Sequence, residues 1–386
     1  MTRFDEFRAA FKGEIVTPHD PTYEQAIDRW AANAQRRAAV VAFVNSPQDV
    51  VLAIKYAKDA TLRIAIRGGG HSAAGTSSTD GGLVIDLSKH LNKVNIDPYQ
   101  KLAYVQGGAE WRAVDEAAIK HGLAAVAGTV NHTGVGGLSV GGGYGWLSGA
   151  HGLVIDNIAE LTVVTADRSI LLANEKQNPE LFWGIRGGGS NFGVVTEFVF
   201  KLHPQRTKVF PGPLVFHPDK CEQIGAFLDK WWPAAKLDEG MLVGMTRMQG
   251  NKQQRVMNTA VASPDLTIAL VHEFFPHKTI NSIPPDAMPY RRDLPGHALI
   301  DVQWKENTPE NSLKAKEIAD VIAAMVPQGE GYGNYTPDSD TLPVAGGVSS
   351  DKTRALFGEH YSRLQAIKKK YDPDMVFNQW YTIVPA

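Results

Sequence analysis

The sequence predicts an α+β protein built from two domains. Its 386 residues exceed the length of an average domain and fall short of three. Over about the first 205 residues, short apolar strands alternate with glycine-rich turns and a few helices. After His203-Pro204, prolines become more frequent and three-glycine runs stop. We therefore expect a domain boundary near residue 205.

The elements of the first domain follow from start and stop signals and from apolar periodicity. Ser46 before Pro47 starts a helix that runs to Asp59, and Gly122 ends a later one. Further helices are predicted over 21–34 and 110–121, and strands over 38–44, 62–67, 81–87, 103–107, 161–165, 170–172 and 194–202.

The remainder of the chain predicts fewer and longer elements. Helices are expected over 221–232, 312–325 and 352–370, with two or three strands between the first two. Tyr371-Asp-Pro373 stops the last helix, and a tail over 376–380 follows.

Composition excludes several classes of protein. The chain is 43% apolar and 21% charged, with 39 basic and 41 acidic residues and a net charge of −2. These values exclude a disordered tail, a coiled coil and a polybasic nucleic-acid binder. No apolar run reaches the roughly 18 residues of a membrane span, and Asp5 and Glu6 stand where a signal peptide would be basic and then apolar. We expect a cytoplasmic protein without nucleic-acid or membrane partners.

The sequence predicts no metal site. Cys221 is the only cysteine, which excludes an intramolecular disulfide and a thiolate cluster. His272-Glu273 and His277 are one residue too far apart for a zinc-binding helix, which Pro276 would also break.

Glycine runs are the unusual feature of the first domain. They lie at 68–70 and 187–189 and over 134–152, where nine of nineteen residues are glycine. Glycine lets backbone amides approach an anion without a Cβ in the way, so three such loops predict a large anionic cofactor held by the main chain. The alternative is a set of ordinary tight turns.

Two other motifs match by letter only. Gly68-x-Gly70-x-x-Ala73 has the dinucleotide-binding spelling, but residues 72–82 are too rich in Gly, Ser and Thr to form the helix that this motif must open. Ser139 lies in a Gly-x-Ser-x-Gly sequence, but we expect neither a long strand before it nor a helix after it. A Rossmann site and a serine hydrolase are therefore disfavoured.

Six segments in order resemble a known family. The segments are 67–75 (RGGGHSAAG), 128–145, 178–183 (NPELFW), 186–195 (RGGGSNFGVV), 332–335 (YGNY) and 371–379 (YDPDMVFNQ). Together they resemble the berberine bridge enzyme-like branch of the vanillyl-alcohol-oxidase flavoproteins, most closely its fungal members. The resemblance implies a two-lobed PCMH-type FAD-binding domain over 1–205. It also implies an antiparallel-sheet substrate domain covered by helices over 206–345, and a C-terminal segment over 346–386 that returns to the FAD domain.

The resemblance further implies FAD as the cofactor, bonded through its 8α-methyl group to His71. The attachment is expected to be single, because Val130 stands where many members carry a second, cysteine attachment. Thr133 occupies a position that helps to decide oxygen access, which leaves oxidase and dehydrogenase open. The expected cofactor-binding residues are Arg67, Gly68, Gly69, Gly70, His71, Ser72, Gly75, Gly128, Thr129, Gly134, Gly136, Gly137, Gly142, Gly145, Val195, Asn378 and Gln379.

The implied activity is oxidation of a CH–OH or amine group of a small molecule by hydride transfer to flavin N5, with dioxygen as a candidate acceptor. Tyr335 is the expected base, which requires nearby cations to lower its pKa by roughly three units from about 10. His132 is the second expected catalytic residue, with Asn131 beside it. Asp86 is expected to be structural.

Two alternatives stay open. FAD could serve as a scaffold for a non-redox cyclisation, or the chain could hold flavin without turnover. The span 206–345 is shorter than usual in the family, with a piece missing around 275–295, so the substrate pocket is expected to be open.

Overall fold

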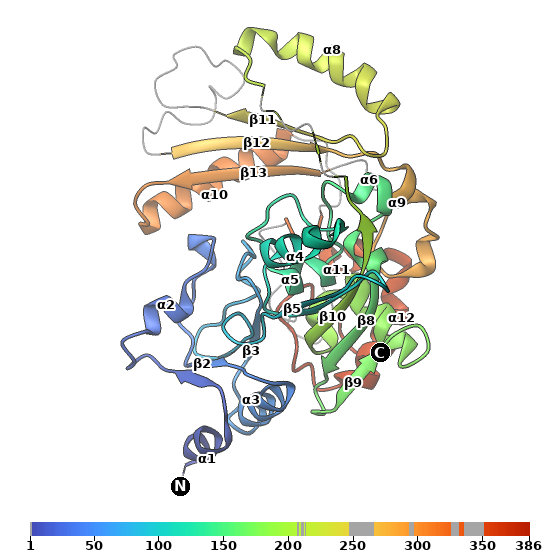
Figure 1. Cartoon of the computed structure of the whole chain (residues 1–386). Helices are drawn as coiled ribbons and strands as arrows, with labels where there is room; N and C mark the ends of the chain where they lie inside the picture. The colour runs from blue at the N-terminus through green and yellow to red at the C-terminus, as the bar shows by residue number, and fades with distance from the viewer. Residues whose placement is uncertain are drawn as a thin grey trace.

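The computed structural model describes residues 2–206, 208–209, 212, 214–246, 266–292, 297–325, 332–335 and 351–386. Three β-sheets with flanking helices make up these residues (Figure 1). This arrangement confirms the predicted α+β class and the antiparallel sheet of the second region. Within the described residues, no helix is both long and apolar enough to cross a membrane.

The first sheet lies near the N-terminus and has the strand order β1-β2-β4-β3. Its strands are β1 (Glu14–Val16), β2 (Val40–Phe43), β3 (Ile64–Arg67) and β4 (Leu83–Asp86). β4 pairs in parallel with both β2 and β3, so all four of its residues are buried. Helix α3 (Pro47–Asp59) packs on this sheet, and the Ser46 side chain caps it as predicted, by accepting from the amide of Asp49.

The second sheet is antiparallel and contains the largest core. Its order is β5-β6-β10-β8-β9, with β7 paired to β10. The strands are β5 (Val94–Asp97), β6 (Leu102–Gln106), β7 (Leu123–Ala125), β8 (Ile158–Val164), β9 (Ile170–Ala173) and β10 (Val194–Pro204). Helices α4 (Trp111–Ala118), α5 (Val135–Val140), α6 (Ser148–His151) and α7 (Pro179–Gly188) accompany it.

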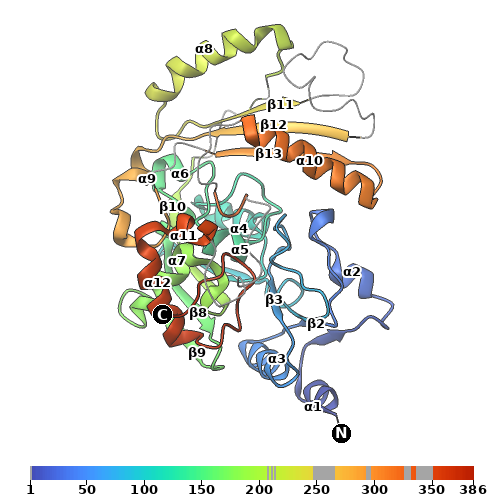
Figure 2. The ribbon, with the colours of Figure 1, turned by 180° about the vertical axis from the view of Figure 1, so that it is seen from behind.

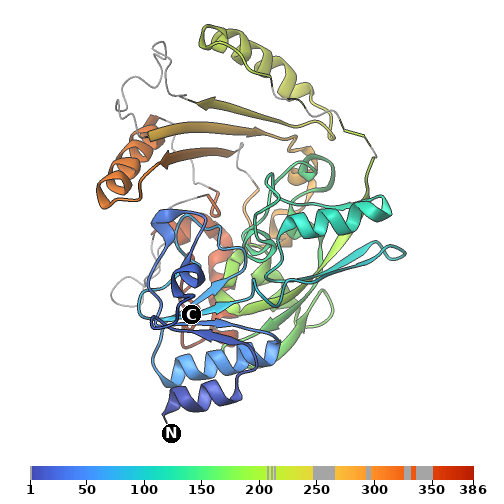
Figure 3. The ribbon, with the colours of Figure 1, turned by 60° about the vertical axis from the view of Figure 1, so that its left-hand side comes forward.

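The third sheet forms a separate layer at the end of the molecule opposite the N-terminus (Figures 1 and 3). It has the order β11 (Met241–Thr246), β12 (Leu266–Phe274), β13 (His297–Trp304) and is antiparallel. Helix α10 (Pro309–Met325) packs on it through Ile318 and Ile322. Helix α8 (Cys221–Trp231) lies outermost, and α9 (Lys278–Ser282) lies beside α6 in the connector between β12 and β13.

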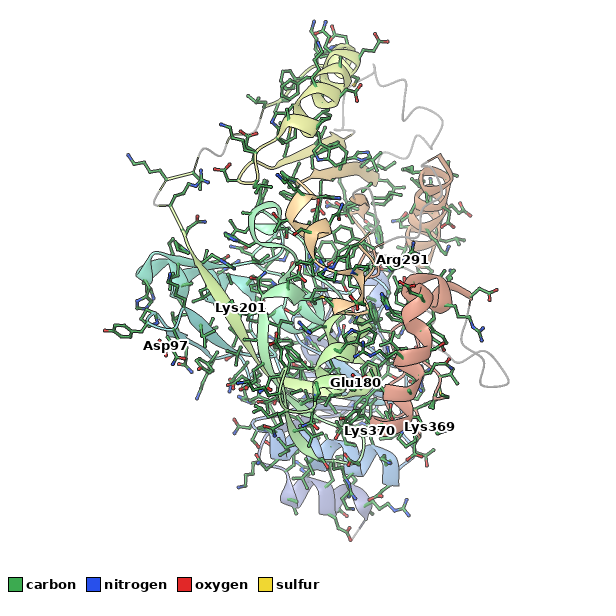
Figure 4. All side chains as sticks on the ribbon, turned by 90° about the vertical axis from the view of Figure 1, so that its right-hand side faces the viewer. Asp97, Glu180, Lys201, Arg291, Lys369 and Lys370 are labelled. Atoms are coloured by element: carbon green, nitrogen blue, oxygen red, sulfur yellow. The ribbon has the colours of Figure 1, made fainter. Side chains whose placement is uncertain are left out.

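The C-terminal segment packs against the second sheet region. Helices α11 (Asp351–Phe357) and α12 (Tyr361–Tyr371) lie next to α7 (Figure 2), and Glu180 of α7 faces Lys370 of α12 (Figure 4). The buried Lys368 ammonium donates to Asp372 and to the carbonyls of Asn191 and Phe377, which fixes the tail. The predicted domain limits stay predictions, and residue 345 lies outside the described residues.

Two predicted helices are wrong in extent. The helix expected over 352–370 is broken at Gly358, which adopts φ +51 and separates α11 from α12. The helix expected over 21–34 is reduced to α2 (Tyr23–Ile27) and a single turn at Ala32–Ala34, because Asp28 is extended. Residues 135–140, for which no helix was predicted, form α5, which contains Ser139 rather than following it.

Candidate active site

Two of the predicted glycine loops lie backbone to backbone. A Cβ added to Gly69 would lie 2.6 Å from the Gly134 backbone, and one added to Gly134 would lie 2.3 Å from the Gly69 amide nitrogen. A Cβ on Gly136 would lie 2.6 Å from the carbonyl oxygen of Gly107. Only glycine fits at these positions, so the fold brings the loops at 68–70 and 134–137 together as the cofactor prediction requires.

The remaining predicted loop residues have mixed surroundings. Arg67 pairs with buried Asp86 at 3.1 Å, which agrees with a structural role for Asp86. Gly142 faces the ring of Tyr290, and Gly145 packs on the backbone of residues 127–128. The other predicted residues make local contacts. Gly75 packs on Arg36, Gly128 packs on Leu138, and the carbonyl of Val195 packs on Gly107. The Ser72 hydroxyl accepts a hydrogen bond from Thr76, and Gly137 has open space beside it.

His71 lies in a cluster of three rings. Trp30 stacks on its imidazole with ring centroids 4.3 Å apart and an interplanar angle of 13°. His132 Nδ1 lies 3.1 Å from His71 Nε2. Burial, and then the neighbouring His132, lower the pKa of His71 to about 4, so His71 is neutral at pH 7. A neutral imidazole is the form that can bond to carbon.

A second polar cluster joins Tyr335 to the third sheet. The Tyr335 hydroxyl donates to Glu273 Oε2 at 3.1 Å, and the Thr129 hydroxyl donates to Glu273 Oε1 at 3.1 Å. Glu273 lies near the end of β12 and is 5% exposed. Burial raises the pKa of its carboxyl, which favours a carboxylate that readily takes up a proton.

The surroundings of Tyr335 differ from the predicted ones. Cations were expected, but the charged group at its hydroxyl is the Glu273 carboxylate. Burial, and then Glu273, raise the pKa of Tyr335, which is opposite to the expected direction. Tyr335 is therefore a neutral phenol at pH 7, and its role as the base stays a prediction that now includes Glu273.

The loop 128–134 connects the two clusters. Its Thr129 hydroxyl donates to Glu273, and its His132 lies beside His71. The amides of Trp111 and Arg112 hold the loop by donating to the carbonyls of Thr133 and Asn131. These two amides belong to the first turn of α4, where backbone donors lack helical partners.

Aromatic side chains form a wall beside Glu273. The indole of Trp146 donates to the carbonyl of Thr129 at 3.2 Å and meets Phe275 edge-on. Tyr144 also meets Phe275 edge-on, and its hydroxyl lies 3.1 Å from His277 Nε2. Trp146 is 47% exposed, so this wall reaches the surface.

The C-terminal tail brings buried polar atoms without partners. Among the described residues, both amide atoms of Gln379, which is 6% exposed, and Oδ1 of Asn378 have no hydrogen-bond partner. Unpaired buried amides are costly, so their presence indicates a polar ligand edge. Together with the glycine loops, these groups fit a cofactor that carries both an anionic chain and a polar ring. No group of three or more metal-ligating side chains occurs in the described part of the chain.

Glu273, Trp30 and His277 were not predicted from the sequence as site residues. Glu273 was weighed only as part of a zinc motif. The available signal was a carboxylate inside the apolar run of residues 266–275, where an acid is costly unless it has a function or a partner.

Comparison with known proteins supports the same identification. A model of the FAD binding domain matches residues 38–174, and a model described as berberine and berberine like matches residues 331–380. The FAD-linked oxidoreductase pgmH of Aspergillus terreus is 27% identical over 475 positions, covering 99% of this chain and 96% of the relative. Since this chain has 386 residues, that relative contains segments that this chain lacks.

A bacterial relative matches a little over half of the chain. The (R)-6-hydroxynicotine oxidase of Paenarthrobacter nicotinovorans is 36% identical over 216 residues, covering 56% of this chain and 47% of the relative.

Solved structures share the fold. The 6-hydroxy-D-nicotine oxidase from Arthrobacter nicotinovorans has a TM-score of 0.76 and 24% identity, covering 98% of this chain and 99% of its own. Glucooligosaccharide oxidase from Acremonium strictum has a TM-score of 0.74 and 20% identity, with full coverage of both chains. On its matched domains and its relatives, this chain belongs to the berberine bridge enzyme-like FAD-linked oxidoreductases.

Proposed function

We propose that this enzyme oxidises a CH–OH or amine group of a small molecule, and that Glu273 and Tyr335 together accept the proton of the substrate heteroatom. The observation that carries this proposal is the hydrogen bond from the Tyr335 hydroxyl to the buried Glu273 carboxylate. When bound, FAD supplies the acceptor for the hydride that leaves the substrate carbon.

The chain would hold FAD by three groups of residues. The glycine loops at 68–70 and 134–137 offer backbone amides for the pyrophosphate, and the Gln379 amide and the Asn378 Oδ1 offer polar atoms for the ring edge. His71 would bond covalently to the 8α-methyl group. Val130, where other members carry cysteine, makes this the single attachment in the proposal.

Proton transfer uses the two hydrogen bonds at Glu273. As the substrate heteroatom gives its proton to the Tyr335 oxygen, the phenolic proton moves to Glu273 Oε2. Thr129 keeps its hydrogen bond to Oε1 and so fixes the orientation of the carboxylate. This arrangement never requires a free phenolate, which agrees with the raised pKa of Tyr335.

The test is anaerobic flavin reduction by candidate alcohols, amines and oligosaccharides, in the wild type and in Glu273→Gln. The amide keeps the size of the side chain but cannot take the proton, so we expect reduction to slow by roughly 10²- to 10⁴-fold. Wild-type reduction rates in Glu273→Gln would refute the proton path.

The same measurement distinguishes the alternatives. Product formation without flavin bleaching would indicate a non-redox cyclase, and the absence of both would indicate a flavin-holding shell. We propose dioxygen as the final acceptor, which predicts one hydrogen peroxide per substrate oxidised in air.

A further inference from the structure

His132 lies within hydrogen-bond distance of the His71 ring. Its Nδ1 lies 3.1 Å from His71 Nε2, and the two ring centroids are 5.0 Å apart. Trp30 stacks on the same His71 ring at 4.3 Å. The His71 ring is therefore held by two side chains from different segments, which fixes its orientation.

The contact restricts which nitrogen of His71 can react. A neutral imidazole has one N–H and one lone pair. When Nε2 of His71 carries the hydrogen, it donates to His132 Nδ1 and leaves the lone pair on His71 Nδ1. Only a nitrogen with a free lone pair can form a new bond to carbon. Donation to His132 thus selects the reactive form of His71, in the way that a second ring partner selects the tautomer of a metal-bound histidine.

We infer that His132 is a positioning residue for covalent attachment of FAD, holding His71 as its Nε2–H form and accepting that proton while Nδ1 bonds to the 8α carbon. The inference rests on the attachment at His71 in the proposed function. The C–N bond would form as one C–H bond of the 8α-methyl breaks, and the proton of that C–H bond would pass to the flavin ring. The two electrons released reduce the flavin ring, and dioxygen then takes two electrons and two protons to give hydrogen peroxide.

The position of His132 suits this role. Its side chain is partly exposed, so a proton accepted from His71 can pass to water. The loop that carries it is held by the first-turn amides of α4, which donate to the carbonyls of residues 131 and 133. His71 is neutral at pH 7, because burial and His132 lower its pKa to about 4.

The test measures covalent coupling rather than turnover. The full chain is produced under riboflavin limitation and then mixed with FAD in air, and the covalent adduct is followed by mass and by flavin in acid-precipitated protein. We expect the wild type to become covalently yellow, and His71→Ala to give a colourless pellet. In His132→Ala the coupling rate should fall by roughly 10²- to 10⁴-fold, the usual range for a positioned base, while non-covalent FAD is retained.

Two further variants separate chemistry from structure. His132→Asn keeps an acceptor oxygen near the position of Nδ1 but cannot carry the proton, so it should bind FAD normally and couple slowly. Imidazole in the buffer should restore coupling in His132→Ala. His121→Ala, an exposed histidine in the turn after α4, should couple at the wild-type rate.

The outcomes are distinguishable. Wild-type coupling rates in both His132 variants would overturn the role of His132 and leave attachment at His71 intact. Slow coupling that imidazole does not restore, together with lost FAD retention, would reduce His132 to a structural residue and overturn the inference. A wild-type pellet without flavin would overturn the attachment itself, and with it the role of His132.

Discussion

The two ends of the molecule are built differently. Around the glycine loops, backbone segments approach so closely that a single added Cβ would lie within 3 Å of the neighbouring main chain at Gly69, Gly134 and Gly136. In the third sheet, the buried apolar cluster consists of Leu266, Ile268, Ile318 and Ile322. Helix α8, which lies outermost, has no buried side chain. The contacts around the glycine loops are thus between main-chain segments, whereas the third sheet, within its described residues, is held by a small side-chain core.

The residues that join the third sheet to the region of the glycine loops include the candidate catalytic residue Glu273. Loops packed this closely leave little room for a change of shape, and the described apolar core of the third sheet is small. Glu273 lies on β12 of the third sheet. Its carboxylate accepts hydrogen bonds from Thr129, in the loop 128–134, and from Tyr335. The buried pair of Arg292 and Asp156 makes a second connection, and Arg291, labelled in Figure 4, belongs to the same connector. We expect substitutions at these junctions to affect turnover most.

The largest effect is expected for Tyr335→Phe. Phenylalanine fills nearly the same volume but removes the hydroxyl that donates to Glu273 and that the proposed proton path requires. Flavin reduction should slow by roughly 10²- to 10⁴-fold, with a much smaller change in substrate affinity. Stopped-flow reduction under anaerobic conditions measures both quantities.

Wild-type reduction in Tyr335→Phe combined with slow reduction in Glu273→Gln would show that Glu273 takes the proton directly. Thr129→Val serves as the control for carboxylate orientation. It removes one hydrogen bond to Glu273 without removing the proton path, so its effect should be smaller.

The next effect compares packing in the two regions. Phe198 of β10 is fully buried and stacks on Phe200, whereas Phe227 of α8 is 50% exposed. Phe198→Ala should lower the free energy of unfolding by about 3–5 kcal/mol, and Phe227→Ala by less than about 1 kcal/mol. Urea unfolding monitored by far-UV circular dichroism measures both. Equal losses would show that α8 is packed as tightly as the central sheet.

The cofactor region could be predicted in more detail than the site between the regions. The glycine runs predict loops whose amides approach an anionic cofactor. In the structure Gly69 and Gly134 approach each other's backbone, and their approach to a cofactor stays a prediction. The role of Glu273 could not be predicted in this way, because its partner Tyr335 lies 62 residues later and only the fold brings the two together. The sequence-based prediction of cations near Tyr335 takes a free phenolate as the base. In the proposed proton path the buried Glu273 carboxylate would accept the proton instead, and Tyr335 would stay a neutral phenol.

Local sequence patterns also predicted the wrong extent for two helices whose ends are set by tertiary contacts. The periodic segment 352–370 predicts one helix, but Gly358 in the left-handed region lets the chain turn so that α12 can pack on α7. Residues 28–31 leave the predicted helix, and Trp30 from this segment stacks on His71. Both breaks in the predicted helices allow contacts between residues that are distant in sequence, and a local sequence pattern cannot predict such contacts.

The smallest effect concerns a histidine pair where the chain leaves the cofactor region. His203, at the end of β10, stacks on His151 with centroids 3.7 Å apart, and its Nε2 lies 2.7 Å from Oδ1 of Asn157. An amide oxygen only accepts hydrogen bonds, so His203 is the neutral Nε2–H form. Burial, then His151, Lys201 and Lys101 lower the pKa of His203 to about 4, and Figure 4 labels Lys201 on β10.

The lowered pKa of His203 determines how the free energy of unfolding changes with pH. Because the folded pKa lies below the unfolded value of about 6.5, the unfolded chain binds more protons between the two values, and stability falls as pH drops from about 6.5 toward 4. The pair is partly exposed and therefore screened by solvent, so we expect a loss on the order of 1 kcal/mol. The difference in unfolding free energy between pH 7 and pH 5 should shrink in His203→Gln, whose amide still donates to Asn157. An unchanged difference in that variant would place the acid sensitivity in other groups, with His71 and its neighbour His132 the next pair to replace.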